Sequence, residues 1–333
     1  MMSKYPIDYE TVSSVIESFN IKNFGSATIR EIVAMVNEIE SLTNQKYVRM
    51  EMGVPGLPPT AVGVNAEIEA LKQGVAGKYP MLDGVADLKK ESARFLKAFM
   101  NIDISPTNCV PVVGSMQGTF ASFLTACQCN KKKNKILFID PGFPVQKQQL
   151  IVLGYEHYSF DVYKYRGKLL KEKIESYYKK GDVAAIIYSN PNNPSWICLN
   201  EEELKIIGDL SNKYDVIVLE DLAYFGMDSR KNLSVPFQAP YQASVAPYAH
   251  KYILLLSSSK VFSYAGQRIG IVAISEELYK TSYQALLDRY GVSEFGNVFV
   301  NRVLYSLSSG TSHSAQYALL AMFKAANDGK LNF

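Results

Sequence analysis

The spacing of apolar residues along the chain changes near residue 108. Before that point, apolar residues recur every three or four positions among polar ones, which predicts amphipathic helices. A loop is expected over residues 52–63, which are rich in proline and glycine. Ser26 is placed to cap the first helix, and Gly74 to end the second. The helical patterns cover residues 26–42, 64–74 and 83–99.

After residue 108, short apolar runs alternate with helical patterns. Runs that are apolar throughout predict strands buried on both faces, and the helices between them indicate a mostly parallel sheet. We therefore predict an α/β fold of three layers, in which helices cover both faces of a mostly parallel central sheet. The predicted strands, several of which end in a turn, lie within residues 108–114, 135–143, 183–194, 215–225, 252–260 and 269–275.

The composition argues against several classes of partner. The chain has 333 residues and a formal net charge of only +3, which does not suggest nucleic acid as a partner. No run of 18 apolar residues predicts a membrane span, and the N-terminus has no apolar core of the signal-peptide kind. The cysteines lack the usual zinc spacings, so we expect reduced structural thiols, no metal and a cytoplasmic location. They are Cys109, Cys127, Cys129 and Cys198.

Polar and aromatic residues follow five of the predicted strands. In open α/β sheets a ligand binds outside the carboxyl ends of the strands, so these residues are the first candidates for a site. They are Gly114 to Gln117, Asp140 to Phe143, Asn190 to Asn193, Asp221 with Tyr224, and Ser257 to Lys260.

Each of these groups has a structural interpretation when it is taken alone. The segment that starts at Gly114 is a turn into a helix, whether or not the helix N-terminus binds a phosphate. Phe143 fits a core, Asp221 fits a helix cap and Lys260 fits a protein surface. The two Asn-Pro steps that begin at Asn190 fit a surface turn equally well.

Taken together, the groups describe one ligand. A helix N-terminus suits a phosphate, the Phe143 ring suits a flat ring, and an asparagine with Tyr224 suits an oxygen on that ring. A buried carboxylate at Asp221 needs a cationic partner such as a protonated ring nitrogen, and Lys260 can attack an aldehyde. Pyridoxal 5'-phosphate has all of these parts, and its protonated ring can withdraw electrons from a substrate.

From about residue 50 to its end, the sequence resembles the class I/II aminotransferase family, whose members are pyridoxal-phosphate enzymes of fold type I. The motif "NPNNP", the run from Glu220 to Tyr224, and "SSSK" followed by Arg268 carry the resemblance. The spacing also matches, with 28 residues from Asn193 to Asp221, 39 from Asp221 to Lys260, and 8 from Lys260 to Arg268.

The resemblance implies a role for each residue. Lys260 would form a Schiff base with the cofactor and shuttle the proton of the substrate, and Asp221 would pair with the pyridine nitrogen. Asn193 and Tyr224 would bind the ring oxygen, and Phe143 would stack on the ring. The expected phosphate contacts are Ser115, Met116, Gln117, Ser257, Arg268 and, from the neighbouring subunit of a homodimer, Tyr79. Gly53 and Asn193 would contact the substrate.

The implied reaction moves an amino group from an amino acid to a 2-oxo acid. Another pyridoxal-phosphate reaction on the same fold, such as C–S lysis or decarboxylation, uses the same anchoring residues and stays open. A chain that binds the cofactor but turns over poorly stays open too. A ligand sensor fused to a DNA-binding module is disfavoured, because the first 50 residues are short and show no basic recognition helix.

Two features depart from the family pattern. The family usually reads Asn-Pro-Thr-Gly, whereas Ser195 and Trp196 follow Pro194 here. Members also continue into a small C-terminal domain, which carries an arginine for the substrate carboxylate. We expect a truncated form rather than a site completed in another way. The expected organisation is a helical arm or part of the small domain over 1–50, a large cofactor-binding domain over 51–310, and over 311–333 the start of a helix toward a truncated C-terminal domain.

Overall fold

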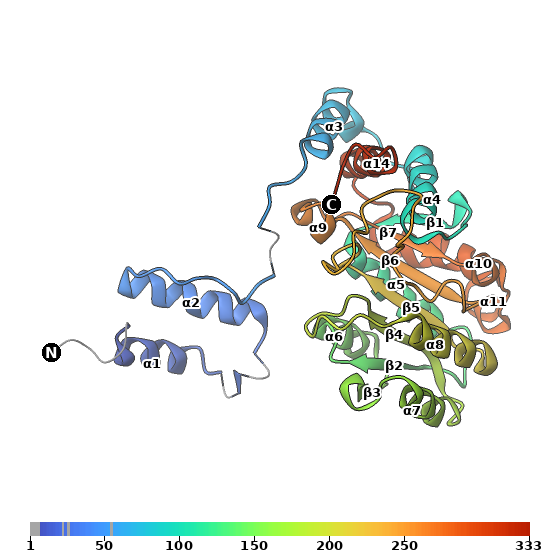
Figure 1. Cartoon of the computed structure of the whole chain (residues 1–333), viewed down its shortest axis with the longest axis horizontal. Coiled ribbons are helices and arrows are strands. Elements are labelled where there is room, and N and C mark those ends of the chain that lie inside the picture. The colour runs from blue at the N-terminus through green and yellow to red at the C-terminus, as the bar shows by residue number, and fades with distance from the viewer. Residues whose placement is uncertain (1–6, 22, 25–26, 54–55) are drawn as a thin grey trace. The chain divides into compact units, whose positions relative to one another are not determined.

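Within the stretch 57–333, the apolar runs form one seven-stranded sheet in the order β1-β7-β6-β5-β4-β2-β3 (Figure 1). The neighbours from β3 to β6 pair in parallel, whereas β7 lies antiparallel between β6 and β1. This confirms the predicted mostly parallel sheet. The strands are β1 (Cys109–Val112), β2 (Lys135–Asp140), β3 (His157–Asp161), β4 (Val183–Ser189), β5 (Ile217–Leu222), β6 (Tyr252–Ser257) and β7 (Gly270–Ile274).

The computed structural model describes residues 7–21, 23–24, 27–53 and 56–333. The chain forms two compact units, Met1–Gly56 and Leu57–Phe333. No helix in the described ranges combines the length and the apolar character needed to cross a lipid bilayer.

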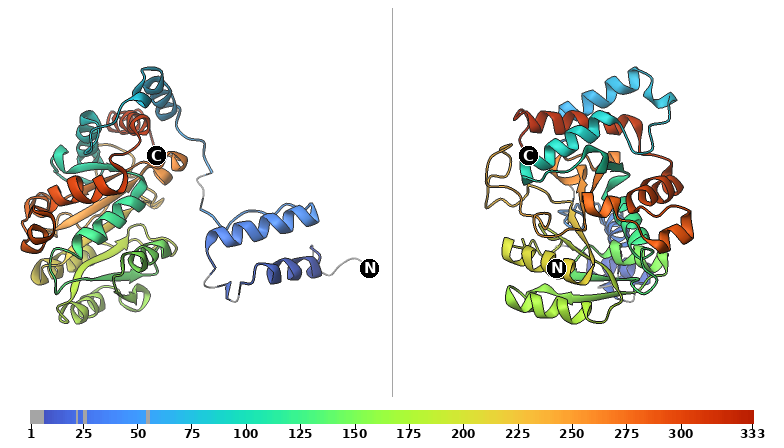
Figure 2. Two further views of the ribbon diagram at one scale, coloured as in Figure 1. Left: turned by 180° about the vertical axis from the view of Figure 1, so that it is seen from behind. Right: turned by 90° about the vertical axis from the view of Figure 1, so that its right-hand side faces the viewer.

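Helices cover both faces of the sheet (Figure 2). Along β5, Val218 belongs to a core cluster that includes residues of α4, α7, α8 and α14. Its neighbour Leu219 belongs to a second cluster, which includes residues of α5, α6, α11 and α12. This alternation confirms the three-layer prediction. The helices of this unit are α3 (Ala61–Lys72), α4 (Ala86–Met100), α5 (Gly114–Ala126), α6 (Pro144–Leu153), α7 (Lys168–Tyr178), α8 (Glu201–Tyr214), α9 (Ser258–Val261), α10 (Glu276–Lys280), α11 (Gln284–Tyr290), α12 (Phe295–Val298), α13 (Tyr305–Ser308) and α14 (His313–Asn327).

Helix α14 lies beside α3 and α4 (Figures 1 and 2). A π-helical stretch, η6 (Phe299–Leu304), continues α12 into α13. The unit also contains the short 3-10 helices η2 (Val75–Gly77), η3 (Pro106–Asn108), η4 (Val162–Lys164) and η5 (Ala265–Gln267).

The sequence placed the start of α3 too late. The Thr60 side chain accepts a hydrogen bond from the Gly63 backbone N–H, so the helix begins at Ala61 inside the predicted loop. A hydroxyl that caps the first turn outweighs the local excess of proline and glycine. Gly74 does follow the end of α3, with a left-handed φ of 81°.

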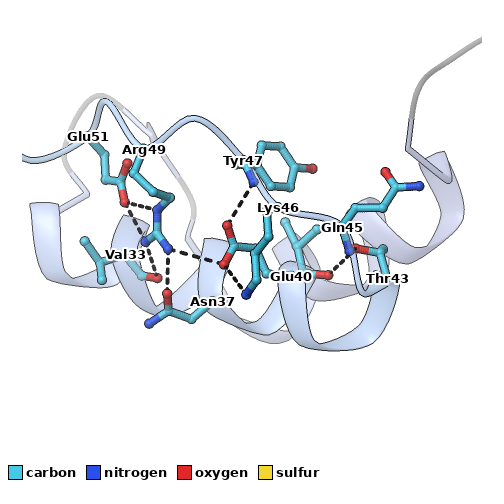
Figure 3. Close-up of polar contacts among 10 residues, drawn as sticks. Val33, Asn37, Glu40, Thr43, Gln45, Lys46, Tyr47, Arg49 and Glu51 are labelled. Carbon is cyan, nitrogen blue, oxygen red and sulfur yellow. Dashed lines mark hydrogen bonds and ion pairs between the residues drawn. The ribbon is translucent and has the colours of Figure 1, made fainter.

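The first unit contains α1 (Tyr9–Ser18) and α2 (Ile29–Thr43), which share a small apolar core. Ser26 lies outside the described residues, and a capping box between Thr28 and Glu31 begins α2. The segment after α2 runs back along it (Figure 3). Glu40 on α2 accepts hydrogen bonds from the Tyr47 backbone at 2.9 Å and from the Lys46 amine at 3.1 Å.

A cluster of phenylalanine rings lies in the core that α4 and α14 share with the sheet. The Phe95 ring centroid lies 5.1 Å from that of Phe225 and 4.4 Å from that of Phe323. Phe225 directly follows Tyr224, and Phe262, 6.2 Å from Phe95, comes two residues after Lys260. The cluster therefore anchors the backbone beside two of the candidate site residues.

We expect Phe95→Ala to lower the free energy of unfolding by about 3–5 kcal/mol, because it removes a buried ring and leaves a cavity among the others. The measurement is denaturant unfolding followed by circular dichroism. Tyr163→Ala, at an exposed ring, is the control and should change that free energy by about 0.5 kcal/mol or less. Equal losses in the two variants would contradict the anchoring role of the cluster.

Candidate active site

The carboxyl ends of five strands lie at one edge of the sheet. β2, β4, β5 and β6 are parallel, and β1 has the same direction as β6 because both pair antiparallel with β7. At this edge Ser257 lies opposite Gly270, which in turn lies opposite Val112. The sequence-derived candidates that follow these strands therefore start from neighbouring positions.

Asp221 is the penultimate residue of β5, and its side chain is buried. One carboxylate oxygen accepts a hydrogen bond from the Gln146 side-chain amide at 2.8 Å, and the other accepts one from the Ala223 backbone N–H at 3.0 Å. Burial raises the pKa of Asp221 to about 6, although the two hydrogen bonds oppose this shift. The carboxylate is thus held in place by neutral donors and is suited to a cationic partner.

Gln146 is a residue that sequence reasoning missed. It lies in the first turn of α6, three residues after Phe143, so the helix brings it to the same strand ends. The sequence does contain a signal for this residue. Gln146 comes three residues after Phe143, at the start of a helix that follows a buried strand.

Lys260 and Tyr224 lie close together. Lys260 is on the short helix α9 directly after β6, and its amine nitrogen lies 5.8 Å from the centroid of the Tyr224 ring. Burial, and then the charge of Arg268, lowers the pKa of Lys260. Burial, and then the charge of Asp221, raises the pKa of Tyr224. Near neutral pH the phenol therefore keeps its proton and can donate a hydrogen bond, while the amine loses its proton more readily than an ordinary lysine.

Two glycines leave room for close contacts at this edge. Arg268 approaches Gly114, and the N-terminus of α5 approaches Gly270. A Cβ atom on Gly114, whose φ is +64°, would lie 2.6 Å from a guanidinium nitrogen of Arg268. A Cβ atom on Gly270 would lie 2.6 Å from the Leu256 carbonyl oxygen and 3.2 Å from the Ser115 backbone nitrogen. The result is a cradle of backbone N–H groups and one guanidinium, which fits a phosphate group.

The side chains around this cradle also stabilise its turns. Ser257 caps α9 by accepting a hydrogen bond from the Ser259 backbone N–H at 3.1 Å. The Gln117 amide accepts a hydrogen bond from the Val113 backbone N–H and donates one to the Ser308 hydroxyl, both at 2.8 Å. Ser115 and Met116 are in the first turn of α5. The predicted roles of these residues in cofactor binding stay predictions.

The turn after β4 joins two strand ends. The Asn192 side chain donates hydrogen bonds to the Pro141 carbonyl at 2.8 Å and to the Ser189 hydroxyl at 3.2 Å. The Asn193 backbone N–H donates to the same hydroxyl at 3.2 Å. These bonds place Asn193, in the turn after β4, near the segment after β2 that leads to Phe143.

Trp196 adopts a backbone conformation that normally favours glycine. Its φ is +58°, which costs a residue with a Cβ atom roughly 1–2 kcal/mol. The indole packs edge-on against the Tyr224 ring with centroids 5.4 Å apart, a contact that contributes about 0.5–1.5 kcal/mol. The turn therefore has a backbone conformation that favours glycine, and the contact roughly offsets the strain.

Two candidates lie outside the group at the strand ends. Tyr79, between η2 and α4, is 93% exposed, which leaves its side chain accessible to another subunit. Gly53 belongs to the first unit and is exposed. The roles of both residues stay predictions. Among the described residues, no group of three or more histidine, cysteine, aspartate or glutamate side chains is arranged to hold a metal ion.

The layered α/β fold thus brings a lysine, a buried aspartate, an arginine and a helix N-terminus to one sheet edge. The family model described as "Aminotransferase class I and II" matches residues 46–329, and the chain belongs to this family. An aminotransferase from Mycobacterium tuberculosis shares the fold with a TM-score of 0.71 and 18% identity, over 92% of this chain and 72% of that one.

Curated relatives carry aminotransferase names. The chain is 24% identical over 272 residues to a probable aspartate aminotransferase of Methanocaldococcus jannaschii, which covers 79% of this chain and 64% of the relative. It is 27% identical over 256 residues to an LL-diaminopimelate aminotransferase of Halothermothrix orenii, over 75% of this chain and 62% of the relative. The matched region thus spans less than two thirds of the length of either relative.

The pH dependence of stability tests the burial of Asp221. Its pKa is raised from an ordinary value of 3.8 to about 6, so its contribution to stability is present below about pH 4 and is lost as the pH rises through 6. We expect Asp221→Asn to gain on the order of 2–3 kcal/mol over the ligand-free parent between pH 4 and pH 7. The measurement is denaturant unfolding at a series of pH values.

Asp103→Asn is the control for this experiment, because the Asp103 side chain is mostly exposed and its ion pair with Lys97 lies at the surface, where such pairs contribute little. It should leave the stability difference from the parent almost constant over the same range. If the difference between Asp221→Asn and the parent is equally constant, the Asp221 carboxyl is not buried as described.

Proposed function

We propose that this chain binds pyridoxal 5'-phosphate and catalyses transamination, in which an amino group moves from an amino acid to a 2-oxo acid. One observation carries the proposal: Lys260, Tyr224 and the buried Asp221 lie at the carboxyl ends of the adjacent strands β5 and β6. The Lys260 amine is 5.8 Å from the centroid of the Tyr224 ring, and burial, followed by the Asp221 charge, raises the pKa of Tyr224.

The residues present fit this cofactor. Asp221 would hold the pyridine nitrogen, Asn193 and Tyr224 the ring oxygen, and Phe143 the ring face. The cradle of Ser115, Met116, Gln117, Ser257 and Arg268 would hold the phosphate. When bound, pyridoxal 5'-phosphate supplies an aldehyde and a protonated ring that withdraws electrons from the substrate.

Lys260 would act as nucleophile and as proton carrier. Burial and the charge of Arg268 lower the pKa of its amine, so the neutral form that attacks an aldehyde is more populated than in an ordinary lysine. The same amine would accept the proton of the substrate α-carbon and later donate it. Tyr224, which keeps its proton, would hold the ring oxygen while Lys260 moves.

The names of the relatives favour transamination over C–S lysis or decarboxylation, and over a chain that only binds the cofactor. We further propose a homodimer in which Tyr79 of the partner subunit reaches the phosphate, with Gly53 near the substrate carboxylate. The exposure of Tyr79 supports the first of these contacts. A cytoplasmic location, without nucleic acid or membrane as partner, is proposed from composition and cysteine usage.

We expect Lys260→Ala to lose the visible absorbance that appears when the parent is incubated with pyridoxal 5'-phosphate and freed of excess cofactor. The variant should also form no detectable 2-oxo acid from a panel of amino acids, because no amine remains to bond the aldehyde and carry the proton. Lys205→Ala, at an exposed lysine that pairs with Asp209, is the control and should behave as the parent does. An unchanged visible spectrum in Lys260→Ala would refute the assignment.

Mixed subunits test the dimer. We expect Tyr79→Ala to weaken cofactor retention, and a hybrid of Tyr79→Ala with Lys260→Ala subunits to recover it at one site. In that hybrid, the subunit that keeps Lys260 receives Tyr79 from its partner. The measurement is the visible absorbance of refolded mixtures, with sedimentation to establish the oligomeric state. Full retention in a monomer, or no recovery in the hybrid, would contradict the contact between subunits.

A further inference from the structure

Trp196 is the one tryptophan of the sequence, and it occupies a turn whose backbone suits glycine better. The turn is closed by hydrogen bonds of 2.9 Å from the Trp196 N–H to the Asn192 carbonyl and from the Asn192 N–H to the Ile197 carbonyl. The indole remains 43% exposed, so it is not a core residue. Stability of the fold therefore does not explain a tryptophan at this position.

The contacts of the indole point to the site instead. Trp196 packs edge-on against the Tyr224 ring at an interplanar angle of 78°, and the same ring lies 5.8 Å from the Lys260 amine. Tyr224 comes just after β5, and its two neighbours come from the turn after β4 and from helix α9 after β6. These neighbours limit the rotamers open to the Tyr224 side chain and therefore where its hydroxyl can lie.

We propose that Trp196 is a positioning residue, which packs against Tyr224 and fixes the direction of its hydroxyl at the sheet edge. The part of this inference that concerns the cofactor rests on the proposed function, because the Tyr224 hydroxyl would then hold the ring oxygen. The contact itself belongs to the ligand-free protein. A glycine at this position would leave the backbone of the turn in place and remove the contact.

The ligand-free protein provides the first test. Excitation of the single tryptophan reports this turn alone, so we expect Tyr224→Ala to shift its emission maximum to longer wavelength as water replaces the ring. Tyr224→Phe should keep the parent emission because the ring remains, and Tyr163→Ala, which changes an exposed tyrosine, is the control. An unchanged maximum in Tyr224→Ala would overturn the packing contact, whether or not the protein binds a cofactor.

The second test uses the protein loaded with pyridoxal 5'-phosphate and follows the pH midpoint of its visible spectrum. A hydrogen bond from Tyr224 favours the charged form of the ring oxygen, so its loss raises the midpoint. We expect Trp196→Gly to raise the midpoint by roughly half a pH unit or more, and Trp196→Phe to restore most of the parent value. The melting temperature of Trp196→Gly should stay near that of the parent, because relief of backbone strain compensates for the lost contact.

A double-mutant cycle decides whether Trp196 acts through Tyr224. In a Tyr224→Phe background, which already lacks the hydroxyl, Trp196→Gly should produce no further shift of the midpoint. Additive shifts would overturn the positioning role. If no visible spectrum forms in the parent, the proposed function fails while the emission test still decides the contact, so the two failures are distinguishable.

Discussion

The burial of the Asp221 carboxyl is the constraint around which the site is arranged. A carboxylate inside a protein is costly unless donors or a cation compensate for the lost water. Here an amide from α6 and a backbone N–H supply hydrogen bonds, and the pKa still rises to about 6. β5 lies inside the sheet between β4 and β6, so the strand ends beside Asp221 are those that carry Asn193 and Lys260. The buried Asp221 carboxylate thus lowers the stability of the ligand-free fold, at the position on the sheet edge where a cationic ligand would bind.

The antiparallel strand β7 has a chemical consequence. Because β6 and β7 are neighbours joined by a short connection, Lys260 after β6 and Arg268 before β7 belong to one compact loop. The guanidinium donates a hydrogen bond to the Ala265 carbonyl at 2.9 Å, and its charge adds to burial in lowering the pKa of the lysine. A parallel connection would need a longer crossover, which would separate the two cations. Phe262, packed within this loop, ties it to the phenylalanine cluster of the core.

Sequence reasoning located the strand ends, and the polar residues that follow them, because both depend on local patterns. The runs before Asp221 and Lys260 are apolar on both faces, and polar residues follow each run directly. β3 was missed because it is an edge strand with mostly exposed residues, which leaves no continuous apolar run. Gln146 was missed because its importance arises from a contact with a residue 75 positions away. Contacts of that range depend on how α6 packs on the sheet, and this cannot be inferred from local periodicity.

The turn at Trp196 shows how a departure from the family motif is accommodated. The backbone keeps a positive φ although the side chain is large, so hydrogen bonds of the turn determine the path of the chain rather than local preference. The side chain at position 196 can therefore be large without a large loss in the stability of the fold. Because Trp196 contacts Tyr224 and Tyr224 neighbours Lys260, such a change alters the surroundings of the reactive groups without moving the strands that carry them. Variation of this kind can tune a site on an unchanged fold, and for that reason fold similarity alone does not identify the substrate.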